Sequence, residues 1–550
     1  MLNPTINRKE ESYLTLNEGI KKLFQVIYKE QNKDKIKDET PKIKVSSLIS
    51  KMAFYYEKIR NSVEYKEEHL QLKNAVLRIL KRQILIQGSI VKIEPYGIST
   101  HLLTELIRAG YLPNNEIPEK KIDDTAKIIA RYISLRGYSL ANINNGDLNK
   151  NDLANWILAM AACEIEEKLD RRKVDQAVIS NMYNVLSPNI KLPDDTEYKK
   201  DKEIQVYISI HRNYLKFDDD MIDFVFFNYF NAGWEEAGEE EIAKIGSKIE
   251  RLRNEINWQA NHPLAKQLDL ITNRYTVFFK VLTETIEEDP AGIYESFRTD
   301  PKSFPRNIKK TCNYKYKLAK TKLWRAAIRS IIYILLTKSI LVLILEMPVT
   351  KWFGEEFNLF SLIINIAFPA LLLFLIVLFT KLPNDENNRQ IIIGIDEIIF
   401  EEKKRRDHFN LKKLVSRGKA LGAIFGIIYT ITFFLTFGAV IWVLDKIKFN
   451  WISIVIFLFF LALVSFFAIR IRKNIRELIV VEQKENILSF FSDFFYVPIV
   501  SAGKWISEKF DKVNVFVFIL DFIIEAPFKI FVEIAEEWTK YVKERKDEIV

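Results

Sequence analysis

The chain has 550 residues, of which 48% are hydrophobic, and it carries 81 Lys and Arg against 72 Asp and Glu. The net charge of +9 is modest for this length and the two signs are mixed, which argues against a nucleic-acid binder. The two cysteines, Cys163 and Cys312, stand in different surroundings, which disfavours a disulfide framework or a Cys-based metal site.

The first 320 residues read as a succession of amphipathic helices, because apolar side chains recur three and four residues apart. The segments LISKMAFYYEKI and DDTAKIIARYISL show this spacing, and turn signals such as RAGYLPNN, NINNGD and EEDPAG separate such segments. The N-terminus lacks the apolar core of a secretory signal. The pattern predicts an all-helical cytoplasmic region over 1–320, with a possible boundary between two lobes near 187–203.

An acidic motif, FDDDMIDF, lies within this region and places Asp219, Asp220 and Asp223 in an Asp-Asp-x-x-Asp pattern on a predicted helix. Clustered carboxylates suit Mg²⁺, and isoprenoid enzymes hold magnesium and a diphosphate by this spacing. Such a site needs a second acidic motif on a facing helix, and EEAGEEE at 235–241 lacks the spacing. We therefore favour an acidic helix start over a metal site, and no catalytic residue, metal or cofactor is predicted.

An acid-free basic stretch, from Lys302 to Arg329, precedes the first strongly apolar segment. Each base beside an anionic inner leaflet contributes about 1 kcal/mol of binding. We therefore expect anionic lipid headgroups to contact this basic collar. The predicted contacts are Lys309, Lys310, Lys315, Lys317, Lys320, Lys322 and Arg325.

Four apolar segments are long enough to cross a bilayer as helices. A helix rises about 1.5 Å per residue and the hydrocarbon core is about 30 Å thick, so a span needs about 20 apolar residues. These segments predict a four-helix transmembrane region over 321–472. The spans are predicted at about 326–348, 357–380, 420–444 and 451–469.

Basic residues flank the predicted spans on one side only. They precede span one, fill the loop between spans two and three, and follow span four, whereas the connections MPVTKWFGEEF and DKIKFN are poor in bases. Trp352, Trp442 and Trp451 would then lie at the outer interface, which suits amphipathic indoles. The sequence therefore predicts a multi-pass protein of the cell membrane with both termini cytoplasmic.

Two polar side chains interrupt the predicted spans: Lys338 in the first and Asn365 in the second. An ammonium in hydrocarbon costs a few kcal/mol, so Lys338 must reach water, a partner or headgroups. We favour snorkelling toward the inner end of the span. The alternative is an anion or proton path lined by Lys338, with Asn365 and the break at Pro369 as polar neighbours.

A stripe of small residues opens the third span, where Gly418, Gly422 and Gly426 recur every four residues. This spacing places them on one helix face, where another backbone can approach closely. Packing within the chain is favoured over a dimer interface.

Residues 473–550 predict an amphipathic helical cytoplasmic tail. Its longest uncharged run, 513–520, is too short to cross a membrane. The tail is expected to lie at the inner interface or to pack against the cytoplasmic region. Charged side chains four residues apart form its polar stripe: Asp521, Glu525, Lys529, Glu533 and Glu537.

These features leave three classes of function open. The favoured hypothesis is a membrane-anchored interaction or scaffold protein at the inner face, with anionic lipid and a protein partner or a second copy as partners. The second is an oligomeric channel or transporter with Lys338 near its path. The third, a lipid-related metal-dependent enzyme using Asp219, Asp220 and Asp223, is the minority hypothesis. Scattered histidines and the lack of a phosphate-binding glycine loop disfavour an enzyme.

Overall fold

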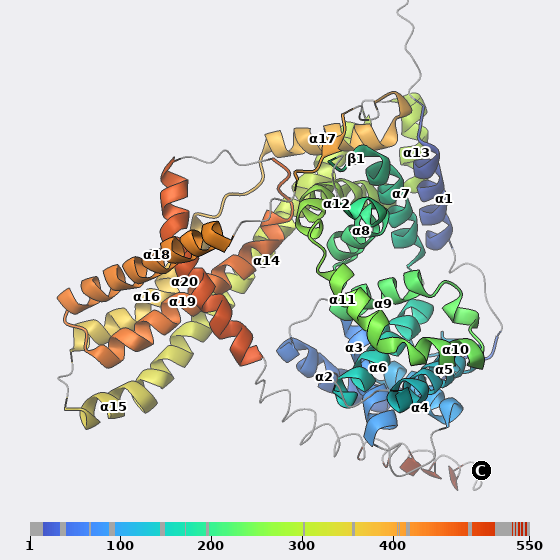
Figure 1. Cartoon of the computed structure of the whole chain (residues 1–550), viewed down its shortest axis with the longest axis horizontal. Coiled ribbons are helices and arrows are strands. Elements are labelled where there is room, and N and C mark those ends of the chain that lie inside the picture. Colours follow the sequence, from blue (N-terminus) through green and yellow to red (C-terminus); the bar gives the residue numbers. More distant parts are fainter. Residues whose placement is uncertain are drawn as a thin grey trace, which may run out of the picture. The chain divides into compact units, whose positions relative to one another are not determined.

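The structure is a computed structural model of the chain. It describes residues 15–32, 40–64, 68–86, 94–142, 149–170, 172–193, 197–300, 303–354, 358–403, 405, 407–413, 419–481 and 487–511, with scattered positions from 531 to 546. Helices dominate these residues, and the strand content is one pair of two-residue strands and two isolated bridges (Figure 1). The predicted all-α class, a multi-helix region followed by four long apolar helices, is confirmed.

The described residues divide into two compact units. The helical unit comprises Gln25–Thr272 with Phe409–Leu411, and the bundle unit comprises Asn273–His408 and Lys412–Val513 with the chain up to Phe24. The predicted regional limits at 320 and 472 remain predictions, and a helix runs through each of these positions without a break.

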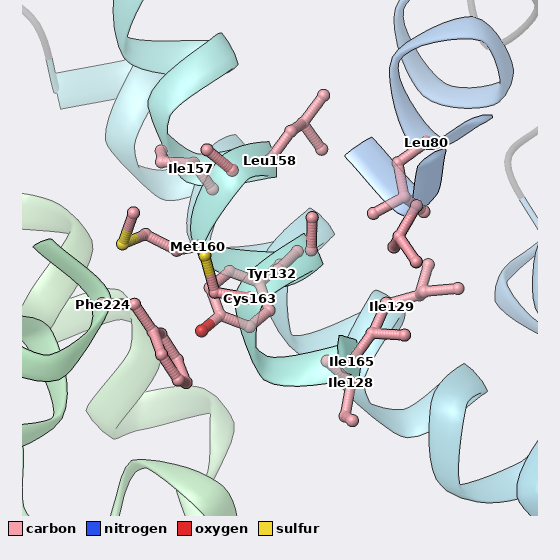
Figure 2. Close-up of a cluster of buried hydrophobic side chains, with 14 of the residues drawn as sticks. Leu80, Ile128, Ile129, Tyr132, Ile157, Leu158, Met160, Cys163, Ile165 and Phe224 are labelled. Atoms are coloured by element: carbon pink, nitrogen blue, oxygen red, sulfur yellow. The ribbon is translucent and has the colours of Figure 1, made fainter. Parts of the chain in front are cut away.

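The helical unit is built around α6 (Lys150–Leu169). Thirteen of its twenty residues are buried, and they face all sides, as expected of a helix that is enclosed by others. Helices α3, α5 and α9 pack on it, and Figure 2 shows Leu80 and Phe224 approaching α6 from opposite sides. The helices of this unit are α2 (Ser47–Glu64), α3 (Glu68–Leu80), η2 (Lys81–Ile86), α4 (Pro95–Arg108), α5 (Lys120–Asn142), α6, α7 (Lys173–Asn189), η4 (Glu197–Lys200), α8 (Lys202–Ile210), η5 (His211–Leu215), α9 (Asp219–Phe230), η6 (Trp234–Glu236), α10 (Glu239–Ser247) and α11 (Ile249–Ala260).

The only strand pair in the described residues belongs to the helical unit. Strand β1 (Ile190–Lys191) follows α7 directly and runs parallel to β2 (Phe409–Asn410), so that Ile190 lies opposite Phe409. Two helices, α1 (Glu18–Gln31) and α12 (Ala265–Glu288), contribute residues to both units.

The bundle unit contains the four helices that are long and apolar enough to cross a membrane. They are Ser303–Trp352, Leu359–Leu378, Leu421–Lys446 and Trp451–Arg476, and each contains most of one predicted span. In the first and third of these helices only 17% of the strongly apolar 18-residue stretch is buried, so most of the apolar surface of these two helices faces outward. The elements are α13 (Pro290–Thr299), α14 (Ser303–Leu341), η7 (Val342–Glu346), α15 (Met347–Trp352), α16 (Leu359–Leu378), α17 (Asp385–Ile399), η8 (Glu401–Lys403), α18 (Lys419–Lys446), α19 (Trp451–Arg476) and α20 (Ile487–Asp511).

Helices α14, α16 and α19 pack against one another, and α20 crosses α19 and α18 (Figure 1). The crossing of α20 over α19 is close: a Cβ added at Gly503 would lie 2.0 Å from the carbonyl oxygen of Ala462. By contrast, a Cβ added at Gly422 or Gly426 would meet nothing within 4 Å, and Gly418 lies outside the described residues. The two described glycines of the predicted stripe therefore make no close helix contact with the described residues.

A buried amide joins three segments at the end of the bundle where α14 enters it. Asn387 of α17 is 1% exposed, and its Nδ2 donates to Tyr316 Oη and to the Leu478 carbonyl oxygen, both at 2.8 Å. Its Oδ1 accepts from the backbone N–H of Val480 at 2.8 Å. This single side chain ties α14, α17 and the segment after α19 together.

Most of the predicted polar stripe of the tail lies outside the described residues.

Candidate functional site

A cluster of buried polar side chains lies inside the bundle unit. Glu346, the last residue of η7, is 1% exposed, and Asn365 of α16 is fully buried. Asn365 Nδ2 donates to both carboxylate oxygens of Glu346, at 2.8 and 3.0 Å. Ser453 Oγ, from α19, donates to Glu346 Oε1. Residues from three of the four apolar helices therefore meet at one carboxylate.

Two prolines and the start of a helix lie beside this cluster. A proline lacks an N–H and its ring clashes with the carbonyl four residues earlier. For Pro348 that carbonyl belongs to Ile344, within the π-helical turn that ends at Glu346. For Pro369 it belongs to Asn365 itself. Ser453 lies in the first turn of α19, where the positive end of the helix dipole favours a nearby carboxylate.

Lys338 of α14 lies in the interior of the same bundle. Its side chain is 0% exposed, and Nζ stands 4.0 Å from the ring centroid of Phe460 in α19. Nζ has no hydrogen-bond partner among the residues that the structure describes. The predicted snorkelling is therefore not seen. Glu346 follows eight residues later, about 12 Å along the helix axis, so opposite charges lie within one apolar bundle.

A small polar pocket of about 10 Å³ adjoins Glu346, which is room for about one water molecule. Thr350 lines this pocket, and its Oγ1, like Oδ1 of Asn365, is buried without a hydrogen-bond partner in the described part of the chain. A water is the smallest group that could satisfy such oxygens. The other lining residues are Asn358, Ser361, Leu362, Lys448, Asn450 and Ser453.

The helical unit holds a much larger cleft, of about 770 Å³, between α6, α7, α8 with η5, and α9. Small-molecule sites commonly occupy about 300–1,000 Å³. Buried side chains that line the cleft form its floor: Cys163, Ile179, Ile204, His211, Met221 and Phe224. Exposed lining residues form its rim: Glu167, Asp170, Gln176, Ser180, Glu203 and Tyr229.

Among the described residues, Arg172 is the only Lys or Arg that lines the cleft, against five carboxylates. Its guanidinium is already held: it pairs with Glu166, Nε lies 3.1 Å from Asp170 Oδ2, and the group stands 5.8 Å from the Phe217 ring centroid. Two carboxylates therefore offset the one cation. The other carboxylates of the lining are Glu167, Asp175 and Glu203, and Asp175 also interacts electrostatically with Arg172.

His211 places an oriented acceptor in the floor of the cleft. The side chain is buried, and Nδ1 lies 2.9 Å from the Tyr207 carbonyl oxygen, so Nδ1 carries the hydrogen. Burial lowers the pKa of His211 to about 4, which keeps the ring neutral at pH 7. The lone pair of Nε2 is then left free, and Nε2 has no hydrogen-bond partner among the described residues.

We expect the stability of the protein to rise between pH 4 and pH 6.5 and His211→Gln to flatten this rise. Because burial lowers the folded-state pKa to about 4, the unfolded chain binds more protons in this window, and stability is lost as pH falls through it. The full effect corresponds to about 3 kcal/mol. Thermal unfolding at several pH values checks this. His408→Gln, the same change at an exposed position, is the control, and equal slopes in both variants would contradict the prediction.

The acidic motif at 218–223 begins α9 and is engaged by protein partners. Asp218 caps the helix by accepting from Met221 N at 3.1 Å. Lys73 Nζ, on a side chain that is 1% exposed, lies 2.6 Å from Asp218 and 2.7 Å from Asp220. Asp223 accepts from Trp156 Nε1 at 2.9 Å, and burial raises the pKa of Asp223 to about 6. Only Asp219 of the predicted motif is exposed.

These contacts favour a helix start with a buried ion pair over a diphosphate site. Within the described residues no group of three or more His, Cys, Asp or Glu side chains is placed to hold a metal ion. The metal-site hypothesis therefore gains no geometric support from Asp219, Asp220 and Asp223.

The basic collar divides into paired and unpaired bases. Lys309 lies 2.9 Å from Asp385, Lys310 lies 3.1 Å from Glu288, and Lys315 pairs with Glu284. The other predicted contacts are exposed and form no ion pair among the described residues: Lys317, Lys320, Lys322 and Arg325.

No protein-family model, curated protein or solved structure matches the chain. Its class is therefore defined by architecture: an all-α chain in which four helices long and apolar enough to cross a membrane follow a multi-helix region. The sequence singled out Lys338 and Asn365 but missed Glu346, Ser453 and the cleft. The proline two residues after Glu346 was the available signal for the first of these.

Proposed function

We propose that this chain is a membrane-anchored binding protein, in which the helical unit receives a ligand and the apolar helices hold the protein in the membrane. The cleft of about 770 Å³ is the observation that carries the proposal, because its volume, buried floor and polar rim are those of a ligand site. The pocket beside Glu346, by comparison, has room for about one water. Recognition is therefore assigned to the helical unit.

The cleft can be tested by closing it. Ser180 lies on the exposed rim, so Ser180→Trp is expected to fill the mouth while leaving the buried floor intact. Thermal shifts of the full chain in nanodiscs are measured with a library of small cations, anions and neutral molecules. At least one class is expected to stabilise the wild type and not the variant. A library in which no compound stabilises the wild type would overturn the proposal.

In the proposed arrangement the four apolar helices cross the cell membrane, the helical unit lies at its inner face and both termini are cytoplasmic. The one-sided basic flanks support this orientation. We expect Lys351→Cys to react with a membrane-impermeant maleimide in intact cells, and Lys381→Cys to react only after permeabilisation. Both positions are exposed, and the native Cys163 and Cys312 are buried, which limits background labelling. Equal labelling of both positions in intact cells would contradict the orientation.

The unpaired bases of the collar are proposed to bind anionic headgroups. Replacing Lys317, Lys320 and Lys322 together by Gln is expected to weaken binding to anionic lipid by about 3 kcal/mol, because each base contributes about 1 kcal/mol. Lipid retained by the purified protein is measured by native mass spectrometry. Lys309→Gln with Lys310→Gln is the control, since both side chains already pair with acids. A loss of lipid that is no larger in the triple variant than in this control would contradict the prediction.

A second candidate function is ion or proton movement through an oligomer of the bundle. A specific observation favours it: the buried ammonium of Lys338 has no hydrogen-bond partner in the described part of the chain. A buried ammonium costs stability, and ionisable side chains inside a membrane commonly mark an ion or proton path. The outward apolar face of α18, with Gly422 and Gly426 open, leaves room for a second copy. Liposome flux that is unchanged by Lys338→Leu would remove Lys338 from such a path.

A further inference from the structure

We propose that the cleft of the helical unit binds an amphipathic organic cation, an amine whose ammonium group is joined to an apolar body. This inference rests on the proposed function and names the chemical class of its ligand. It follows from three independent features of the cleft: the floor, the charge of the rim and the oriented imidazole.

The floor requires an apolar body. Ile179, Ile204 and Phe224 line the cleft and are buried, and Tyr207 and Phe217 add aromatic surface beside them. A fully hydrophilic ligand would leave these surfaces without a partner. A phenyl or alkyl group of a few carbons would cover them and gain the free energy of apolar burial.

The rim requires a positive charge. Arg172, the one Lys or Arg among the described lining residues, already pairs with Glu166 and Asp170. Glu203 lies on the exposed rim and forms no ion pair among the described residues. Glu203 and Glu167 leave a negative potential at the mouth. An ammonium beside these carboxylates and near the aromatic rings is attracted by both. An anionic ligand would meet carboxylates instead.

The imidazole of His211 selects a donor. Its Nδ1 hydrogen is directed to the Tyr207 carbonyl, so Nε2 offers a lone pair and no hydrogen. The side chain is 6% exposed and lines the cleft. A primary ammonium can donate to Nε2, whereas a carboxylate has no hydrogen to give. The buried acceptor and the rim carboxylates therefore both disfavour an anionic ligand.

Three probes that share a phenylpropyl group and differ in charge test this proposal. 3-Phenylpropylamine is positive, 3-phenylpropanol is neutral and 3-phenylpropionate is negative. Binding is measured by calorimetry on the full chain in nanodiscs of zwitterionic lipid, with empty nanodiscs as the blank. The amine is expected to bind at least tenfold more tightly than the alcohol and the acid. Glu203→Gln is expected to weaken the amine about fivefold, while Glu255→Gln, the same change on exposed α11 surface, leaves it unchanged.

Ser180→Trp serves as the second variant because it blocks the mouth without removing a carboxylate, and its expected effect is a loss of at least twentyfold in amine affinity. Binding of the alcohol or the acid with equal or greater affinity, lost in Ser180→Trp, would overturn the cation proposal and leave the ligand cleft standing. Amine binding that survives both Glu203→Gln and Ser180→Trp would place the amine outside the cleft and overturn the cation proposal. Failure of all three probes and of the wider library would overturn both proposals.

Discussion

Glu346→Leu is expected to destabilise the bundle unit by about 2–6 kcal/mol, because it leaves two buried donors without an acceptor and each such group costs about 1–3 kcal/mol. The change leaves the Asn365 amide and the Ser453 hydroxyl without their acceptor, inside an apolar bundle. Unfolding in mixed micelles of lipid and SDS measures the loss.

Lys338→Met is expected to have the opposite sign. Nζ of Lys338 makes no hydrogen bond with the described residues, so its removal strands no donor or acceptor, and Met fills a similar volume. An ammonium inside hydrocarbon costs a few kcal/mol, so its removal is expected to be neutral or stabilising. The two variants together separate the two charges. If Lys338→Met destabilised the bundle as much as Glu346→Leu, the charges would act as a tight pair and this asymmetry would be wrong.

Glu346→Gln serves as the matched control for the charge. Glutamine keeps one carbonyl oxygen that can accept from Asn365 and Ser453, so only the charge and one acceptor oxygen are lost. A smaller loss than in Glu346→Leu is therefore expected in the same micelles. Loss of flux in Lys338→Met without loss of stability would in turn favour the transport hypothesis.

The fold class was predictable because it depends on local patterns. Apolar side chains at helical spacing recur throughout 1–320, and four runs of about 20 apolar residues stand out after Lys322. Both signals are read within one helix at a time. The observed apolar helices accordingly contain most of each predicted span, and their ends differ by a few residues, apart from the first, where α14 extends the helix back to Ser303.

The candidate sites depend on which helices meet, and periodicity does not report that. Glu346 lies eight residues after Lys338 and nineteen before Asn365, and the spacing of apolar residues does not show that these side chains share one interior. The π-helical turn before Pro348 and the packing of α16 and α19 bring Asn365 and Ser453 to it. The cleft likewise needs four helices, and its residues run from Cys163 to Tyr229.

Gly503→Ala is expected to disrupt the contact of α20 with α19. The new Cβ would lie 2.0 Å from the Ala462 carbonyl oxygen and 2.6 Å from its carbon. These are backbone atoms, which cannot rotate away as a side chain can, so the helices must separate. Overpacking of this kind costs about 1–3 kcal/mol and sometimes more. Hydrogen exchange of 487–511, read by mass spectrometry, is expected to show lost protection.

Gly422→Ala is the matched control, and it is expected to act in the opposite direction. The added methyl would meet nothing within 4 Å, and alanine favours a helix interior over glycine by up to about 1 kcal/mol. The two glycines therefore differ in what faces them, although the sequence spacing drew attention to Gly422 and gave no reason to single out Gly503. Equal loss in both variants would mean that α18 meets a close neighbour outside this chain, and a second copy packed on the Gly422 face would then be the physical explanation.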